Sequence, residues 1–238
     1  MSEIAEFFSV CWIQTIIAIV AAYLISSVNT SIIVTRIVLH EDIRTLGSGN
    51  AGFTNVLRCV GKTPAIITFV GDFLKGVVSV LIAFLLITFT VKENMELYRA
   101  YLMYLSGLFA VVGHTFPVYY KFKGGKGVVT TAAVMLMLDW RILLIGIAVF
   151  GIMFISTRII SACAILNSAV YPLSTLGVKL LDFYGFTTVL SPFKELTPAF
   201  IVFAVAAALI NSALVIIRHK DNIKRLIRGE EKKATIKK

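Results

Sequence analysis

Cysteine and charged residues are scarce in this chain, and each shortage argues against certain classes of protein. Only 3 cysteines occur among 238 residues, at positions 11, 59 and 163. Their odd number and wide spacing suggest neither a disulfide framework nor a zinc site, so we expect ordinary buried or interfacial thiols. Charged residues make up 15% of the chain, whereas 58% is hydrophobic and the mean hydropathy is +0.89. A soluble domain cannot bury so much apolar surface, so the composition indicates a membrane protein.

Several catalytic sequence patterns are also absent. No His is followed five residues later by Asp, because positions 45, 119 and 224 hold Thr, Tyr and Lys. The His-x4-Asp pair of the common glycerolipid acyltransferases is therefore missing. The sequence contains no Gly-x-Ser-x-Gly elbow, no Walker sequence and no cluster of metal-binding residues. We expect no metal site, no cofactor and no nucleic-acid partner.

Long apolar runs predict an all-α polytopic integral membrane protein with about seven transmembrane helices. The apolar segments are 6–28, 64–90, 98–118, 127–138, 142–157, 160–181 and 199–217. A full span needs about 20 residues, so the fourth and fifth segments are short. They are either two helices joined by a tight turn at 139–141 or one bent unit, which leaves a count of six open. We expect residues 1–238 to form a single transmembrane domain with a short cytoplasmic tail, 218–238.

The distribution of Lys and Arg predicts the orientation in the membrane. With the N-terminus outside, 17 of the 23 Lys and Arg residues fall on the cytoplasmic side, nine of them in the tail. Lys75 lies inside the second apolar segment, where Asp72 is a plausible buried partner. The first residues have neither a positive start nor a cleavage site, so we expect the first span to be retained.

The first polar stretch is RTLGSGNAGFTNVLR, residues 44–58. Its glycines at 47, 49 and 52 allow positive φ and a close approach to a ligand. Ser48, Asn50, Thr54 and Asn55 supply neutral donors, and arginines at both ends suit a phosphate. A flexible interhelical loop with topology-setting arginines explains the same residues, because the P-loop spacing is absent.

The second polar stretch is GHTFPVYYKFKGGKGVVT, residues 113–130. Lys121, Lys123 and Lys126 surround two adjacent glycines, and an apolar segment begins directly afterwards. A loop that enters a helix in this way directs N–H groups and the positive helix end at an anion. The alternative is that the lysines only set the topology. We expect His114 to be mainly structural and to anchor this loop.

The third polar stretch is RHKDNIKRLIRGEE, residues 218–231, directly after the last span. By itself it predicts a basic amphipathic helix at the membrane surface. His219 and Asn222 are three residues apart and so lie on one helix face. The charge count places all three stretches, and Ser161 with them, on the cytoplasmic side. Together they predict a site for a small anionic ligand that carries phosphate.

These residues carry a resemblance to a known family. DIRTLGSGNAGFTNVLR, GHTFPVYYKFKGGKGVVT and HKDNIKRLIRGEE resemble, in order, the three motifs of the bacterial acyl-phosphate:glycerol-3-phosphate acyltransferases, the PlsY-type membrane enzymes. GDFLKG at 71–76 resembles the stretch that follows the first motif. The chain departs from the family at residues 26–29, Ser-Ser-Val-Asn in place of Gly-Ser-Ile-Pro, and at Phe53, where Ala is usual.

The resemblance implies a seven-helix enzyme of the bacterial inner membrane. Its substrates would be acyl-phosphate and glycerol 3-phosphate, and acylation of the sn-1 hydroxyl would give lysophosphatidic acid and phosphate for phospholipid biosynthesis. We expect a multi-pass monomer in the lipid bilayer, with an external N-terminus and a cytoplasmic active site. The alternative is a transporter of an organic phosphate, but its charges would lie near the bilayer midplane and internal repeats would be expected.

We expect the motif residues to surround the two phosphates. The catalytic candidates are Ser48, Arg58, Lys126, His219 and Asn222. The substrate-binding candidates are Gly47, Gly49, Asn50, Thr54, Asn55, Lys123, Gly124, Gly125, Ser161 and Glu230. The proton of the hydroxyl passes either to His219 or to a phosphate oxygen of the donor. We favour the second route, because the sequence provides no carboxylate to orient His219 as a base.

Overall fold

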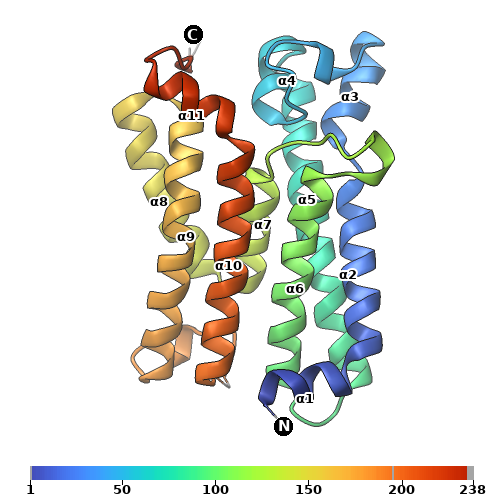
Figure 1. Ribbon diagram of the computed structural model, residues 1–238, viewed down its shortest axis with the longest axis vertical. Coiled ribbons are helices and arrows are strands. Elements are labelled where there is room, and N and C mark those ends of the chain that lie inside the picture. Colours follow the sequence, from blue (N-terminus) through green and yellow to red (C-terminus); the bar gives the residue numbers. More distant parts are fainter. Residues whose placement is uncertain (1, 195, 235–238) are drawn as a thin grey trace. The chain divides into compact units, whose positions relative to one another are not determined.

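The computed structural model describes residues 2–194 and 196–234, and every regular element in those two ranges is a helix (Figure 1). The chain divides into two compact units, residues 1–138 and residues 139–238, called unit 1 and unit 2 below. Each unit is described by itself. The single domain expected from the sequence stays a prediction.

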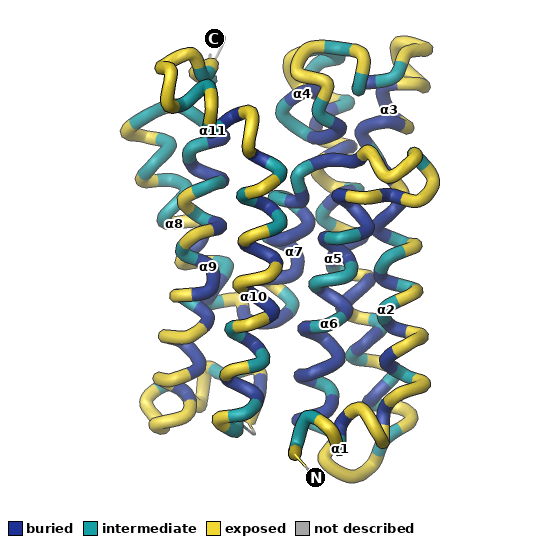
Figure 2. Tube along the Cα trace, in the orientation of Figure 1, coloured by how far each residue is buried: buried dark blue, intermediate teal, exposed yellow. Residues whose placement is uncertain are grey.

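Unit 1 consists of seven α-helices and two short 3-10 turns. The helices are α1 (Glu3–Val10), α2 (Trp12–Ser27), α3 (Thr30–Leu39), α4 (Phe53–Cys59), α5 (Lys62–Thr90), α6 (Met95–Thr115) and α7 (Val128–Leu138). The 3-10 turns are η1 (Ile43–Thr45) and η2 (Val118–Tyr120). Helices α2, α5 and α6 pack side by side, and α7 packs on α5 and α6 (Figure 1). Helix α6 is buried along most of its length, whereas the loop after it is largely exposed (Figure 2).

Asn29 interrupts the first long apolar segment. Its backbone is extended, with φ −100° and ψ 101°, and its side-chain oxygen accepts a hydrogen bond from the Ile32 amide at 3.2 Å. Asn is a favoured helix N-cap, because its side chain satisfies an amide that has no partner within the helix. The chain therefore ends α2 at Ser27 and starts α3 at Thr30, so the helical region continues past the predicted boundary at residue 28.

Unit 2 is a bundle of three long helices and one short helix. The helices are α8 (Trp140–Thr157), α9 (Ile160–Phe183), α10 (Pro198–Arg218) and α11 (Lys220–Ile227), and the 3-10 turn η3 is Thr188–Leu190. Asp139 caps α8, since its side chain accepts from the Arg141 amide at 3.2 Å. The fourth and fifth apolar segments are therefore two separate helices. Helix α9 packs against both α8 and α10.

A balanced group of buried charges ties α8 to α9. Arg141 donates from one side of its guanidinium to Asp139, at 2.8 and 2.7 Å, and from the other to Asp182, at 2.7 and 2.6 Å. Lys179 is fully buried and donates to Asp139 at 2.8 Å. Buried charges are tolerated when each has a partner and hydrogen bonds. Lys179, which the charge count had placed outside, thus lies inside the helix pair.

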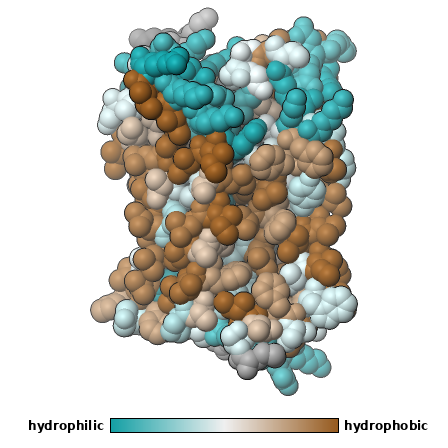
Figure 3. Space-filling view, viewed as in Figure 1, coloured by the Kyte–Doolittle hydropathy of each residue, from teal (hydrophilic) through white to brown (hydrophobic). Residues whose placement is uncertain are grey.

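The prediction of about seven membrane helices is confirmed. In the described ranges six helical segments are long and apolar enough to cross a membrane, and Val128–Leu138 is a shorter apolar helix. Large apolar side chains such as Ile66 on α5 and Leu173 on α9 are exposed, as expected for surfaces that face lipid. In Figure 3, hydrophilic side chains gather at the end of unit 2 that carries α11, and apolar ones cover its long helices.

Candidate active site

The first motif, residues 44–58, folds as a compact turn that depends on two glycines and then as most of α4, and the whole stretch is called the first-motif loop below. Gly47 has φ 57° and Gly49 has φ 69°, the left-handed region that glycine favours. A Cβ on Gly47 would also lie 2.5 Å from Asn55 Oδ1 and 2.6 Å from Cys59 Sγ. The expected positive φ is confirmed at these two positions. It is wrong for Gly52, which is extended at φ −170° and precedes α4.

Asn55 closes this loop from within. Its side-chain oxygen accepts from the Ser48 amide at 3.0 Å, and its Nδ2 donates to the carbonyls of Ile43 and Leu46 at 3.2 and 2.9 Å. A buried apolar cluster supports the loop from below, formed by Ile32, Ile43, Ala51, Val56 and Ala65. The loop is therefore held in one shape. The side chain of Asn55 was expected to bind substrate, but its hydrogen-bonding groups face the backbone of the loop.

Arg44 joins the first-motif loop to the second-motif loop, residues 116–127. Its Nη1 donates to the carbonyls of Tyr120 and Lys123 at 2.9 and 3.3 Å. Asp42 holds the guanidinium from the other side through Nε at 3.0 Å and Nη2 at 2.7 Å. The hydrogen bond from Arg44 lowers the pKa of Asp42 to about 2 and outweighs the effect of burial. Arg44 thus holds two loops together and does not present its charge to a phosphate.

The second-motif loop packs its two glycines against the end of α6. The amide of Gly124 donates to the carbonyl of Thr115, and that of Gly125 to the carbonyl of His114, both at 3.2 Å. These bonds satisfy carbonyls that the end of a helix leaves without partners. A Cβ on Gly125 would overlap His114 Nε2 and the Ala51 carbonyl. The glycines are therefore needed for space, and their amides face α6 instead of the anion expected from the sequence.

The polar side chains of unit 1 lie on or beside these joined loops. Ser48 and Arg58 are exposed, as is Lys123 in the second loop. Lys126 is partly buried two residues before α7 begins. Asn50 and Thr54 are also partly buried. Unit 1 thus provides an exposed hydroxyl, Ser48, and the exposed cations Arg58 and Lys123. Asn55 and Arg44 fix the backbone that carries them.

In unit 2 three donors converge on one carboxylate. Glu231 Oε1 accepts from Ser161 Oγ at 2.8 Å and from Asn222 Nδ2 at 2.6 Å, and Oε2 accepts from Arg225 Nε at 2.5 Å. Burial raises the pKa of Glu231, but these three hydrogen bonds outweigh it and hold the pKa below its ordinary value. Ser161 and Asn222, predicted together as phosphate ligands, are therefore brought together around an oxyanion.

His219 is buried at the junction of α10 and α11. Its Nδ1 lies 2.8 Å from the carbonyl oxygen of Val215. Because a carbonyl only accepts, Nδ1 carries the hydrogen, and the acceptor of the neutral ring is Nε2. The Val215 carbonyl thus fixes the tautomer of the ring.

A comparison with protein families identifies the chain. The family model for glycerol-3-phosphate acyltransferase matches residues 16–229, a range that includes the first two motifs and the third as far as residue 229. The chain belongs to the glycerol-3-phosphate acyltransferase family. The family expected from the motif resemblance is thereby confirmed.

Curated relatives and solved structures agree with this acyltransferase family. The glycerol-3-phosphate acyltransferase of Syntrophotalea carbinolica is 38% identical over 90% of this chain and 95% of that protein. The one from Streptococcus sanguinis is 34% identical over 92% of this chain and 91% of that protein. The crystal structure of PlsY (YgiH), an integral membrane glycerol 3-phosphate acyltransferase, in its glycerol 3-phosphate form matches with a TM-score of 0.73. It is 29% identical, over 93% of this chain and 96% of that one.

Glu231 is the residue of this acyltransferase that the sequence reasoning missed. The neighbouring Glu230 was predicted to bind substrate, but it is exposed and takes no part in the three-donor cluster. Two adjacent acidic residues give no pattern by which to choose between them.

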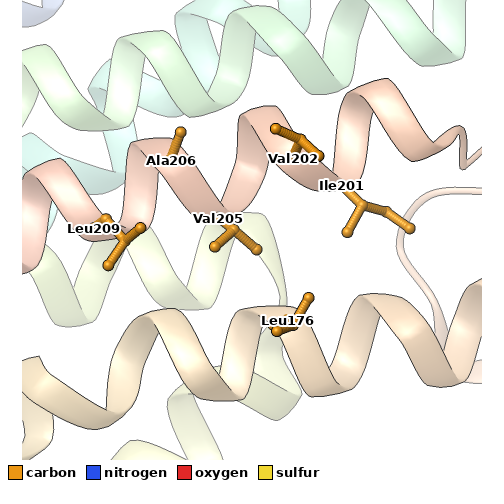
Figure 4. A pocket seen from close by; sticks show the side chains of 6 residues that line it. All are labelled: Leu176, Ile201, Val202, Val205, Ala206 and Leu209. Atoms are coloured by element: carbon orange, nitrogen blue, oxygen red, sulfur yellow. The ribbon is translucent and has the colours of Figure 1, made fainter.

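An apolar hollow of about 250 Å³ lies on unit 2 of the acyltransferase, between α9 and α10 (Figure 4). Its lining residues are Leu176, Ile201, Val202, Val205, Ala206 and Leu209. All are aliphatic, so the hollow suits hydrocarbon and not a phosphate. No group of three or more His, Cys, Asp or Glu suited to a metal ion occurs within residues 2–194 and 196–234.

Proposed function

We propose that the protein transfers an acyl group from acyl-phosphate to the sn-1 hydroxyl of glycerol 3-phosphate, which gives lysophosphatidic acid and phosphate. The observation that carries this proposal is the pair of loops joined by Arg44, with the exposed donors Ser48, Arg58 and Lys123 on them. The curated relatives are named for glycerol 3-phosphate as the acyl acceptor. Two crystal structures of PlsY are described as the glycerol 3-phosphate form and the lysophosphatidic acid form of that enzyme. The acyl-phosphate donor and the sn-1 position rest on the motif resemblance.

Acyl-phosphate is a mixed anhydride, so it already has a good leaving group. The hydroxyl oxygen of glycerol 3-phosphate forms a bond to the acyl carbon, and the bond from that carbon to the phosphate oxygen breaks. We assign to Ser48, Arg58 and Lys126 the stabilisation of the charge that develops on the acyl oxygen and the departing phosphate. Orientation of the two bound anions supplies much of the remaining acceleration, because it converts a bimolecular step into a unimolecular one.

The proton of the attacking hydroxyl passes, in our proposal, to a phosphate oxygen of the donor. Val215 orients the ring of His219 but carries no negative charge with which to stabilise an imidazolium. We therefore assign His219 and Asn222 to the binding of glycerol 3-phosphate, together with Ser161. The carboxylate of Glu231 supports the choice of Ser161 and Asn222, since both donate to an oxyanion there.

The charge distribution supports a place for this reaction at the cytoplasmic face of the bacterial inner membrane. We propose an external N-terminus, a cytoplasmic C-terminus and a monomer. Neither a cofactor nor a metal is required by the proposed chemistry, because the donor is already activated.

Purified protein in liposomes tests the proposal. Release of phosphate should require both acyl-phosphate and glycerol 3-phosphate, and lysophosphatidic acid should form in equal amount. Lys126→Met should lower kcat by about 10²- to 10³-fold, the cost of losing one preorganised donor to a developing oxyanion. Its unfolding temperature should match that of the wild type.

Lys121→Gln is the matched control, because it removes an exposed lysine from the same loop. It should leave kcat unchanged. Uptake of an organic phosphate without any acylated product would overturn the proposal in favour of a transporter.

A further inference from the structure

Three ionisable side chains are buried together in unit 1, outside the loops described above. Asp72 and Lys75 lie one turn apart on α5, and Lys75 Nζ is 2.8 Å from Asp72 Oδ1. His114, in the last turn of α6, has its Nδ1 3.7 Å from the same oxygen. The exposed fractions are 1% for Asp72, 6% for Lys75 and 4% for His114.

This cluster also contacts the backbone of neighbouring elements. Lys75 Nζ donates to the Val28 carbonyl at 3.0 Å, at the break between α2 and α3. Thr130, in the first turn of α7, donates to the Asp72 carbonyl at 3.1 Å. A Cβ on Gly76 would lie 2.8 Å from the Cβ of Ala133, so α5 and α7 pack closely here. The stretch of α5 that carries the cluster thus packs directly on the start of α7, which follows Lys126 by two residues.

His114 connects the cluster to the meeting point of the two motif loops. Its carbonyl accepts from the Gly125 amide at 3.2 Å. Its Nδ1 faces Asp72, whereas a Cβ on Gly125 would lie 2.2 Å from its Nε2 and 2.5 Å from the Ala51 carbonyl of the first loop. The ring therefore lies between the buried carboxylate and the backbone of both loops, and Lys126 is the next residue after Gly125.

Stability alone does not account for such a group in an apolar helix bundle. Removing two charges from water costs several kcal/mol per ion, and apolar residues of the same size often stabilise a protein as well or better. Inside a membrane span an ionisable residue is expected to have a functional reason. The function suggested by the contacts is the placement of the loop that carries Lys126.

We propose that Asp72, Lys75 and His114 are positioning residues that hold the Gly124–Gly125 backbone, and with it Lys126, in the geometry needed for acyl transfer. This inference rests on the proposed function for its catalytic consequence. Its structural consequence, an ordered second loop, does not depend on that function.

Two measurements on the full-length protein in liposomes test the proposal. The first is the kinetics of phosphate release from acyl-phosphate and glycerol 3-phosphate. Asp72→Asn and His114→Gln should each lower kcat by about 10- to 100-fold with little change in either KM, because a small misplacement of a catalytic group has an effect of this size. Asp72→Asn leaves Lys75 unpaired, so Asp72→Asn combined with Lys75→Met is the variant to use if the single one fails to fold.

Tyr101→Phe is the matched control. It removes a buried side-chain hydrogen bond, to Glu3, from the same helix at a distance from the loops. It should leave kcat unchanged. In a Lys126→Met background, His114→Gln should lower kcat less than about threefold further, because it acts through Lys126.

The second measurement is the mobility of a nitroxide label at position 123 in a cysteine-free chain. His114→Gln and Asp72→Asn should increase it, and Tyr101→Phe should not. The proposal is overturned if His114→Gln and Asp72→Asn leave the mobility of the label unchanged. It is also overturned if His114→Gln lowers kcat as much in the Lys126→Met background as it does in the wild type. The wild type could release no phosphate while the substitutions still increase the mobility of the label. In that case the proposed reaction is wrong, but the positioning of the loop by the three residues is supported.

Discussion

The Val215 carbonyl accepts a hydrogen bond from Nδ1 of His219 and so sets the tautomer of the ring. Enzymes that use His as a general base commonly place a third group against the other ring nitrogen to stabilise the cation that forms. A neutral carbonyl fixes the tautomer but gives less stabilisation of positive charge. This arrangement suits a residue that binds an anion through its ring better than one that takes up a proton.

His219→Ala should therefore weaken substrate binding and leave the pH dependence of the rate unaltered. We expect the KM for glycerol 3-phosphate to rise about 10- to 100-fold, the value of a hydrogen bond to a charged group. The measurement is a profile of kcat and kcat/KM from pH 5 to 9 for wild type and variant. A titrating limb near pH 6.5, close to the usual pKa of imidazole, that disappears in the variant while KM stays constant would identify His219 as the base.

His40→Asn is the control for this experiment. His40 is exposed at the end of α3 with φ 57°, a conformation that Asn tolerates. The substitution removes an imidazole from the chain without straining the backbone. Both kinetic constants should stay at their wild-type values.

The sequence was a better guide to which polar residues lie near one another than to the hydrogen-bond partners of each. Residue type and spacing were enough to select Ser161 and Asn222, which do meet around one oxyanion. The roles of Arg44 and Asn55 were not readable, because a guanidinium or an amide serves a ligand and a backbone carbonyl equally well. Only the folded loop determines which partner is within reach.

The segment after α11, residues 228–234, folds back onto the start of α9. The Ala234 amide donates to the Arg158 carbonyl at 2.7 Å, and Glu231 takes up the three donors described above. Its attachment is thus expected to depend on the charge of one carboxylate.

The attachment of this segment should weaken in acid. The pKa of Glu231 is lowered in the folded chain from an ordinary value of 4.5. A depressed carboxyl pKa stabilises the folded state fully above the unfolded value, and this contribution is lost as the pH falls through the folded value. A nitroxide label at position 232 of a cysteine-free chain should be immobile at pH 7 and become mobile as the pH falls below the ordinary value and through the lowered pKa of Glu231.

Glu231→Gln should make the label at position 232 mobile already at pH 7. Glu230→Gln is its neighbour and matched control, because the side chain of Glu230 is exposed. It should leave the label immobile. A pH-independent line shape in all three proteins would show that the segment is held by something other than the carboxylate.

The helices themselves were predicted well, and their interruptions were not. Apolar length located every long helix, since a membrane span must satisfy its backbone internally. The break at Asn29 and the short helix α4 depend on single side chains that cap or close a turn. The buried pairing of Lys179 with Asp139 was also missed, because their separation of 40 residues is set by the packing of α8 on α9.

The positive charge of the chain is gathered in the loops that carry the motifs and in the tail. The net charge is +10, and 17 of the 23 Lys and Arg residues lie in segments assigned to one side of the membrane. Such an asymmetry determines the orientation of polytopic proteins during insertion. The same residues would attract anionic substrates to that side.

This asymmetry predicts which positions a membrane-impermeant thiol reagent reaches. In a cysteine-free chain, single cysteines at the exposed positions 121 and 233 should react in inverted vesicles and stay protected in right-side-out vesicles. A cysteine at the exposed position 92, between α5 and α6, should behave in the opposite way. Reaction of all three positions from one side would refute the proposed topology.

The hydrogen bonds by which Arg44 joins the two motif loops have a consequence for folding during synthesis. Arg44 contacts Tyr120 and Lys123, which follow it in the sequence by 76 and 79 positions, and both precede residue 139. The ribosome therefore delivers both glycine loops, the buried cluster behind them and the start of α7 before any helix of unit 2 exists. Since domains generally fold from the N-terminus as they are synthesised, the Lys126 loop can reach its final shape while the residues that would bind glycerol 3-phosphate are still untranslated.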